Sequence, residues 1–247
     1  MKVFVYSEKG KMKKRCEDSA VVAGEIISDA YFECEVDNTS CIVALADGVG
    51  GNAGGDCASK YVLSELKNIS MSDISCVDLK NCIVEMNEKL LQYGFNTTDK
   101  KNMATTMTGL MFTENKEFVF HIGNTRLYML QGSYLKQITQ DQTIYQWFVN
   151  QGQIESAQSC NRNEITYCMG GGDKKFINGL QVKEYTNLKQ CGRILMTTDG
   201  IHEYVSIDEL EEFMLGDVSE NKIRKLTEKA NAKGSEDDKT IIVIDKM

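Results

Sequence analysis

The sequence has no proline and only two histidines among its 247 residues. Its turns must therefore come from glycine, asparagine, aspartate and serine, and no isomerisation of an X-Pro bond can slow folding. No two cysteines form a Cys-x-x-Cys pair, and no histidine or cysteine stands at zinc-ligand spacing beside the acidic clusters described below. These absences exclude the common zinc-site patterns.

An excess of positive charge is also missing. The net charge is -8 and the isoelectric point is near 5.0, whereas a broad surface for nucleic acid or an anionic membrane requires a positive footprint. Residues 1–15 include five lysines and lack the apolar core of a signal peptide. Apolar runs such as residues 41–46 are far too short to span a bilayer. We expect a cytoplasmic protein with no nucleic-acid or membrane partner.

The nine cysteines are an odd number, and several of them fall inside apolar runs. This pattern favours small buried hydrophobic residues in a reducing compartment. No cysteine is followed six positions later by an arginine, so the phosphate loop of a cysteine-dependent phosphatase is absent. A cysteine is therefore a poor candidate for a nucleophile.

The composition is that of a globular protein, with 42% hydrophobic and 26% charged residues. Nothing in the composition marks a boundary between two domains, so we expect a single domain over residues 1–247. Residues rich in β-branched and aromatic side chains predict strands at 19–27, 41–46, 105–112, 118–122, 126–130, 193–197 and 240–244. Apolar spacing predicts helices over residues 57–66, 79–90 and 223–230, the last ended by Gly234.

The order of these elements favours an α+β sandwich over a doubly wound sheet. The three strands between residues 105 and 130 are separated by only a few residues, too few for a parallel crossover, so we expect an antiparallel meander there. Residues 140–172 are rich in Gln, Asn and Gly with one short helical pattern, and we interpret them as a surface flap.

Acidic side chains gather at four points, each at the edge of an apolar run: Glu17-Asp18, Asp47-Gly48, Thr198-Asp199-Gly200 and Glu236-Asp237-Asp238. Such a cluster suits hard divalent cations that take oxygen ligands, above all Mg²⁺ or Mn²⁺. Asp47 opens the glycine-rich stretch 48–55 between a strand and a helix, where glycines permit close backbone approach. The phosphate-loop patterns G-x-x-x-x-G-K-[ST] and G-x-G-x-x-G are both missing, so a nucleotide site is the weaker alternative.

Taken together, these motifs make the chain similar to the metal-dependent Ser/Thr protein phosphatases (the PPM, or type 2C, family), most closely its compact bacterial members. The carriers are 16–19 (CEDS), the Asp47 loop, 104–106 (ATT), 123–126 (GNTR), 138–143 (ITQDQT), 169–171 (MGG), 198–200 (TDG) and 237–240 (DDKT). They stand in the family's order over nearly all of the chain. The resemblance implies an αββα four-layer sandwich of two mainly antiparallel sheets flanked by helices, with the metals in a cleft at one end.

The resemblance also implies the roles of individual residues. Asp47 would bridge two divalent cations, with Asp199 and Asp237 on one of them and Glu17 and the Gly48 carbonyl on the other. Asp18 would hold metal-bound water. Two cations roughly 4 Å apart lower the pKa of a bridging water, so hydroxide exists near neutral pH and no side-chain nucleophile is needed.

The chain departs from the family pattern at three positions. Lys13 stands where a phosphate-binding arginine is expected, and it supplies a point charge without a bidentate fork. Asn124 replaces the acid that would help to hold a third, weaker cation, which puts that site in doubt. Asp238 replaces an asparagine and adds a carboxylate. Of the two histidines, we expect His121 to be a satisfied core residue and His202 to be structural rather than catalytic.

The sequence therefore predicts a phosphatase that hydrolyses phosphoserine and phosphothreonine on proteins, presumed targets of a Ser/Thr kinase, with Lys13 and Asp18 assisting the metals. Two alternatives stay open. A non-catalytic member that binds phosphoproteins is favoured only by Lys13 and Asn124, and retention of the carboxylates speaks against it. A hydrolase of small phosphoesters fits the same spacing.

Overall fold

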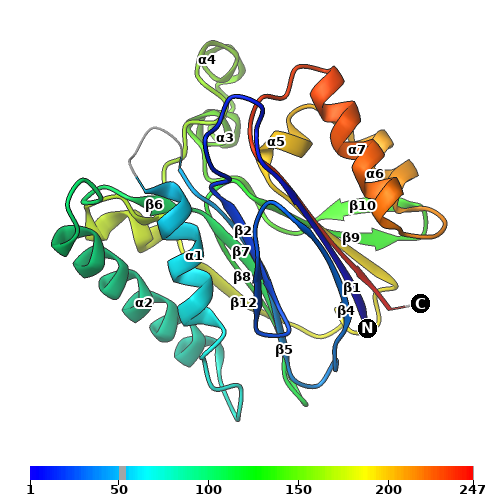
Figure 1. Ribbon diagram of the computed structural model, residues 1–247, viewed down its shortest axis with the longest axis horizontal. Helices are drawn as coiled ribbons and strands as arrows, with labels where there is room; N and C mark the ends of the chain where they lie inside the picture. Colours follow the sequence, from blue (N-terminus) through cyan, green and yellow to red (C-terminus); the bar gives the residue numbers. More distant parts are fainter. Residues whose placement is uncertain (50–53, 247) are drawn as a thin grey trace.

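The computed structural model describes residues 1–49 and 54–246, and it contains two six-stranded sheets (Figure 1). One sheet has the order β10-β9-β13-β14-β1-β4 and the other β12-β8-β7-β5-β2-β3. The pair β6 and β11 forms a separate small sheet. The strands are β1 (Lys2–Glu8), β2 (Asp18–Val22), β3 (Glu25–Ile27), β4 (Tyr31–Glu35), β5 (Cys41–Asp47), β6 (Ala104–Thr105), β7 (Met107–Phe112), β8 (Glu117–Ile122), β9 (Arg126–Gln131), β10 (Tyr134–Gln137), β11 (Met169–Gly170), β12 (Gln181–Tyr185), β13 (Arg193–Thr197) and β14 (Lys239–Asp245).

Helices cover the outer faces of the two sheets (Figure 1). They are α1 (Gly55–Leu66), α2 (Cys76–Asn96), α3 (Ile144–Asn150), α4 (Ile154–Ser159), α5 (Asp199–His202), α6 (Ile207–Met214) and α7 (Glu220–Ala232), with a 3-10 helix η1 (Lys174–Gly179). α1 and α2 pack on the sheet that contains β5, and α6 and α7 pack on the sheet that contains β1. Every strand pair in these sheets is antiparallel within the described residues. The expected αββα sandwich is confirmed.

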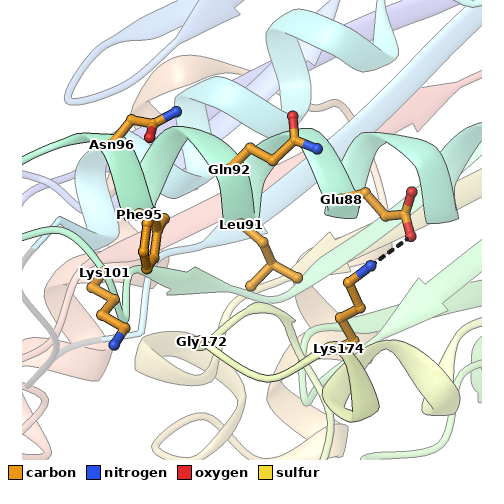
Figure 2. A pocket seen from close by; sticks show the side chains of 8 residues that line it. All are labelled: Glu88, Leu91, Gln92, Phe95, Asn96, Lys101, Gly172 and Lys174. Carbon is orange, nitrogen blue, oxygen red and sulfur yellow. Dashed lines mark hydrogen bonds and ion pairs between the residues drawn. The ribbon is translucent and has the colours of Figure 1, made fainter.

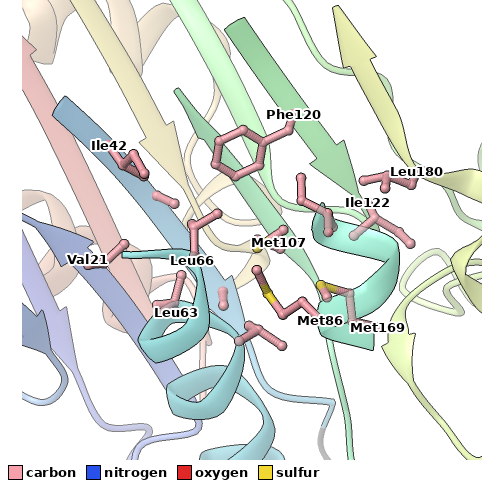
Figure 3. Close-up of a cluster of buried hydrophobic side chains, with 14 of the residues drawn as sticks. Val21, Ile42, Leu63, Leu66, Met86, Met107, Phe120, Ile122, Met169 and Leu180 are labelled. Atoms are coloured by element: carbon pink, nitrogen blue, oxygen red, sulfur yellow. The ribbon is translucent and has the colours of Figure 1, made fainter. Parts of the chain in front are cut away.

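Along each central strand, successive side chains face two different hydrophobic cores. In β5, Val43 and Leu45 point to the core between the sheets, whereas Ala44 and Ala46 point to the core beneath α1 and α2. Figure 3 shows that second core, where Leu63 and Leu66 of α1 and Met86 of α2 meet the sheet. Because successive side chains of a strand face opposite ways, a strand covered on both faces reads as a continuous apolar run.

Local sequence signals begin and end the helices. Ser75 caps α2 and Ser206 caps α6, each with an acidic partner three residues later that completes a capping box. Gly234, at φ 98°, follows α7 and allows the left-handed turn that ends it. The predicted helices over 57–66, 79–90 and 223–230 are confirmed, and α6 is an additional one.

The structure corrects two strand predictions. The predicted strand 19–27 is a hairpin of β2 and β3, because Ala23 and Gly24 both take positive φ at its turn. The expected meander is wrong in its third strand: β7 pairs with β8, but β9 pairs with β13 and β10 in the other sheet. Gly123, at φ 104°, lies at the crossing, and a Cβ there would come within 2.5 Å of Thr106.

The segment interpreted as a flap contains α3 and α4, which pack on each other and lie at one end of the sandwich (Figure 1). Thr143 pairs with Ile165 across its base, and β11 ties its end to β6. Across residues 1–49 and 54–246, none of the helices combines the length and the apolarity needed to cross a bilayer.

We predict that Gly109→Ala destabilises the sandwich by overpacking the core under α1 and α2. A Cβ at Gly109 would lie 2.4 Å from the Phe120 ring and 2.5 Å from Ala44 Cβ. Inserting a methyl group into such a site costs about 1–3 kcal/mol, measurable by urea unfolding. Phe120→Leu in the same chain should recover part of the loss. Strictly additive effects of the two changes would contradict this packing.

Candidate metal centre

The acidic residues converge from both sheets. Asp18 opens β2 and stands directly opposite Asp47, the last residue of β5. Asp199 begins α5 just after β13, and Asp237 lies two residues before β14. A cleft of about 190 Å³ opens at this point, lined by Lys13, Asp47, Gly48, Val49, Thr106, Asn124, Asn163, Ile165, Asp199 and Asp237. The structure thus brings together residues that are separated by up to 224 positions (Lys13 to Asp237) in the chain.

Backbone hydrogen bonds fix the start of the Asp47 loop. The Asp47 carbonyl accepts from the N–H of Thr106 at 2.9 Å, and the N–H of Gly48 donates to the Glu17 carbonyl at 3.1 Å. A Cβ at Gly48 would lie 2.4 Å from the Gly55 carbonyl oxygen, so only glycine permits this approach. The part of the predicted loop at residues 50–53 lies outside the described residues.

Lys13 lies among three carboxylates. Its Nζ is 2.5 Å from Asp237, 3.1 Å from Glu17 and 3.2 Å from Asp238. Burial alone would lower the pKa of Lys13, but the hydrogen bond to Asp237 and the charges of Asp237 and Asp238 outweigh it and raise that pKa above its ordinary value. An ammonium ion thus holds together carboxylates that would otherwise repel one another.

Asp238 has a structural role that the sequence did not indicate. It is only 2% exposed, and its two oxygens accept from the N–H groups of Gly10 and Glu17, each at 2.7 Å. Asp238 therefore fastens the loop that carries Lys13 and Glu17 to the start of β14. Glu17 Oε1 points toward α1, since a Cβ at Gly55 would lie 2.7 Å from it.

Asp18 is fully buried with one oxygen unsatisfied. Its Oδ2 accepts from the Thr198 hydroxyl at 2.9 Å, whereas its Oδ1 has no hydrogen-bond partner within the part of the chain that the structure describes. Burial and then the charge of Asp238 raise the pKa of Asp18 to about 8. A buried carboxylate oxygen with no partner is costly unless a proton or a cation meets it.

The pKa values of Asp47 and Asp199 are also raised. Burial and the neighbouring charges of Asp18 and Asp199 raise the pKa of Asp47 well above its ordinary value. Burial and the charge of Asp237 raise the pKa of Asp199 to about 6, although Asn124 Nδ2 donates to its Oδ2 at 3.1 Å. Crowded oxygen donors that repel one another fit hard divalent cations.

A second group of possible ligands lies beside α5 and comprises Asp141, His202 and Glu203. The Arg126 guanidinium already serves both acids: it binds Asp141 through Nε and Nη2 at 2.6–3.0 Å and Glu203 at 3.3 Å. His202 Nδ1 lies 2.9 Å from the Thr197 hydroxyl. Because an arginine occupies the position that a cation would take, this group stabilises the fold around α5 rather than offering a metal site.

His121, Cys16 and Cys41 lack the properties of catalytic groups. His121 is buried with both ring nitrogens paired, to Thr108 at 2.8 Å and to the Gln140 carbonyl at 3.0 Å, and burial lowers its pKa to about 4. Burial raises the pKa of the Cys16 and Cys41 thiols to about 12, which disfavours their thiolates.

A family model for protein phosphatase 2C matches residues 16–236. The chain belongs to the protein phosphatase 2C family. All the carboxylates described above except Asp237 and Asp238 fall within the matched range.

Bacterial phosphatases are among its relatives. The chain is 28% identical over 211 residues to the serine/threonine protein phosphatase PstP of Mycobacterium tuberculosis, with 83% of this chain and 40% of PstP covered. It therefore spans less than half the length of PstP. It is 24% identical over 216 residues to the serine/threonine phosphatase stp of Listeria monocytogenes, with 83% and 84% covered.

Solved structures of serine/threonine phosphatases share the fold. The crystal structure of M. tuberculosis PstP/Ppp superposes with a TM-score of 0.76 at 26% identity, covering 99% of both chains. Staphylococcus aureus Stp1 gives a TM-score of 0.80 at 24% identity, covering 99% of this chain and 94% of that one, a likeness that concerns the fold alone.

We predict that the carboxylate cluster stabilises the metal-free protein less as the pH rises from about 4 to about 8. The effect is measured as the difference between wild type and Asp47→Asn, because buried His121 and His202 contribute with the opposite sign. A carboxyl whose folded pKa is raised binds more protons when folded than when unfolded, so its contribution is present below pH 4 and lost as the pH passes the folded values of about 6 for Asp199 and about 8 for Asp18. Urea unfolding in EDTA should show this fall. Asp47→Asn, which removes one repelling charge, should raise the stability at pH 8 by about 1–2 kcal/mol.

The matched control is Asp217→Asn, which changes an exposed aspartate far along the chain and should leave the pH dependence intact. Equal pH profiles for wild type and Asp47→Asn would show that the carboxylates do not repel one another in the folded protein.

We also predict that Lys13→Met tightens Mn²⁺ binding by roughly tenfold, about 1.4 kcal/mol, because the ammonium now neutralises carboxylates that a cation would bind. Titration calorimetry measures this directly. Lys14→Met, at the exposed neighbouring lysine, is the control and should change nothing. Unchanged or weaker Mn²⁺ binding in Lys13→Met would contradict the competition.

Proposed function

We propose that this chain hydrolyses phosphoserine and phosphothreonine on proteins with the help of two divalent cations. The support is its membership of the protein phosphatase 2C family, the names of its relatives and the geometry of the cleft. The observation that carries the proposal is the convergence of Asp47, Asp199 and Asp237, whose charges repel one another, on one cleft that also holds a lysine.

The proposed ligand set follows the positions around the cleft. Asp47 would be shared by both cations, with Asp199 and Asp237 on one of them and Glu17 and the Gly48 carbonyl on the other; all of these residues except Glu17 line the cleft. Oxygen-only donors favour Mn²⁺ or Mg²⁺. A third cation is doubtful, since Asn124 offers a neutral amide that already donates to Asp199.

When bound, the cations supply an activated water and neutralise charge on the phosphoryl oxygens. The chain contributes the rest. Lys13 lines the cleft and attracts the phosphate dianion as a point charge, without the two parallel hydrogen bonds of an arginine. Asp18 offers its unpartnered Oδ1 to hold the attacking water, and Thr198 keeps the carboxylate oriented through Oδ2. Burial disfavours the thiolates of Cys16 and Cys41, so neither of them supplies a nucleophile.

The proposed setting is a single catalytic domain over residues 1–247 with a flap at about 140–172, whose Asn163 and Ile165 reach the cleft. Its substrates would be phosphoproteins made by a Ser/Thr kinase. Nine free cysteines support a reducing, cytoplasmic location.

The test is hydrolysis of p-nitrophenyl phosphate and of a phosphothreonine peptide with Mn²⁺ and with EDTA. We expect activity on both that EDTA abolishes, and that Asp47→Asn lowers roughly a thousandfold because the shared ligand is lost. Iodoacetamide should leave activity largely intact. Asp47→Asn turnover above a tenth of wild type at saturating Mn²⁺, or inactivation by labelling one cysteine, would overturn this mechanism.

A further inference from the structure

A groove of about 290 Å³ lies between α2 and the two loops that flank the β6–β11 pair. In Figure 2, Glu88, Leu91 and Phe95 extend from α2 toward the opposite wall, which carries Lys101, Gly172 and Lys174. We call it the α2 groove; Gln92 and Asn96 complete its lining.

The α2 groove exposes apolar side chains that do not pack in the hydrophobic core. Phe95 is 72% exposed on the last turns of α2, and Leu91 is half-buried one turn earlier. The buried face of α2 is a different one, formed by residues such as Ile83, Met86 and Leu90. An exposed aromatic beside an aliphatic side chain in a concave site is typical of a surface that binds something.

Two lysines, Lys101 and Lys174, and one glutamate, Glu88, line the groove, which gives it a small positive excess although the whole chain carries a net charge of -8. Lys101 Nζ lies 5.7 Å from the centre of the Phe95 ring, and Lys174 forms an exposed ion pair with Glu88 at 3.1 Å, an interaction worth little. Asp173 uses its carboxylate to cap η1 at the N–H of Lys175. Within the described residues, Lys101 has no carboxylate within salt-bridge distance, so an acidic side chain of a partner would complement it.

The groove lies close to the cleft. Lys101 precedes Thr105 by four residues, and Thr105 pairs with Gly48 at the cleft. On the other wall, Gly172 follows Gly170, which pairs with Ala104. Four residues of chain span at most about 14 Å, and one strand spacing adds about 5 Å. At most about six residues of an extended peptide are therefore needed to bridge the two sites.

We propose that the α2 groove binds an acidic segment of the phosphoprotein substrate, with one apolar side chain against Phe95 and Leu91 and carboxylates near Lys101 and Lys174. The phosphorylated residue then lies in the cleft, within about six residues of this segment. The inference rests on the proposed function, and it assigns part of the substrate selectivity to a surface outside the reaction centre.

The test compares phosphothreonine peptides that carry a Glu-Leu-Glu segment six residues before or after the phosphothreonine with the same peptides carrying Lys-Ser-Lys. For one of the two positions of the segment, before or after the phosphothreonine, we expect the kcat/KM of wild type to be about tenfold higher for the Glu-Leu-Glu peptide than for the matching Lys-Ser-Lys peptide. Phe95→Ala and Lys101→Glu should each remove most of this preference and leave p-nitrophenyl phosphate hydrolysis unchanged. Because Phe95 is so exposed, its truncation does not threaten folding.

Tyr134→Ala and Lys136→Glu are the matched controls, since they change an aromatic residue that is 71% exposed and an exposed lysine on β10, in the other sheet. Equal kcat/KM for acidic and basic peptides, or equal effects of groove and control variants, would overturn the proposal.

A separate binding experiment tests the groove even if the chain has no phosphatase activity. A fluorescein-labelled, unphosphorylated Glu-Leu-Glu peptide should bind wild type in EDTA, as measured by anisotropy, and should lose at least tenfold in affinity to Lys101→Glu. No saturable binding in this arm contradicts the groove, whereas an inactive wild type on p-nitrophenyl phosphate contradicts the proposed function alone.

Discussion

Mutual repulsion among buried carboxylates is the constraint on which the rest of this structure depends. Asp18 and Asp47 face each other across a strand pair, and Asp199 lies close enough to raise the pKa of Asp47. Asp18 is fully buried and Asp47 is half-buried beside the cleft, so water screens these charges only in part and their repulsion lowers the stability of the fold. We propose that the cations of the proposed chemistry also stabilise this fold, because they would offset that repulsion.

The remaining polar residues of this end of the molecule keep that cluster in position. Lys13 supplies an internal positive charge, and Asp238 fastens its loop through two backbone N–H groups. Arg126 forms ion pairs with both Asp141 and Glu203. Because Glu203 directly follows α5, these ion pairs hold in place the helix that begins at Asp199. The shape of the cleft therefore depends on the ion pairs around it as well as on the carboxylates that line it.

The sequence predicted the fold class because strands covered on both faces, such as β5, read as continuous apolar runs. It did not predict which sheet β9 joins, because that depends on the turn at Gly123 and on partners far along the chain. The acidic residues were found from their positions at strand ends, and their roles as ligands stay predictions. The structural role of Asp238 and the α2 groove could not be predicted, since both depend on contacts between distant segments.

The central claim is that cations replace protons in the carboxylate cluster. Calorimetric titration of Mn²⁺ at pH 6.5, repeated in two buffers of different ionisation enthalpy, measures both the number of ions bound and the protons released. The account predicts about two ions per chain and a net release of protons, because the raised pKa values keep part of the cluster protonated until the ions bind. Binding without proton release, or no saturable binding, would contradict it.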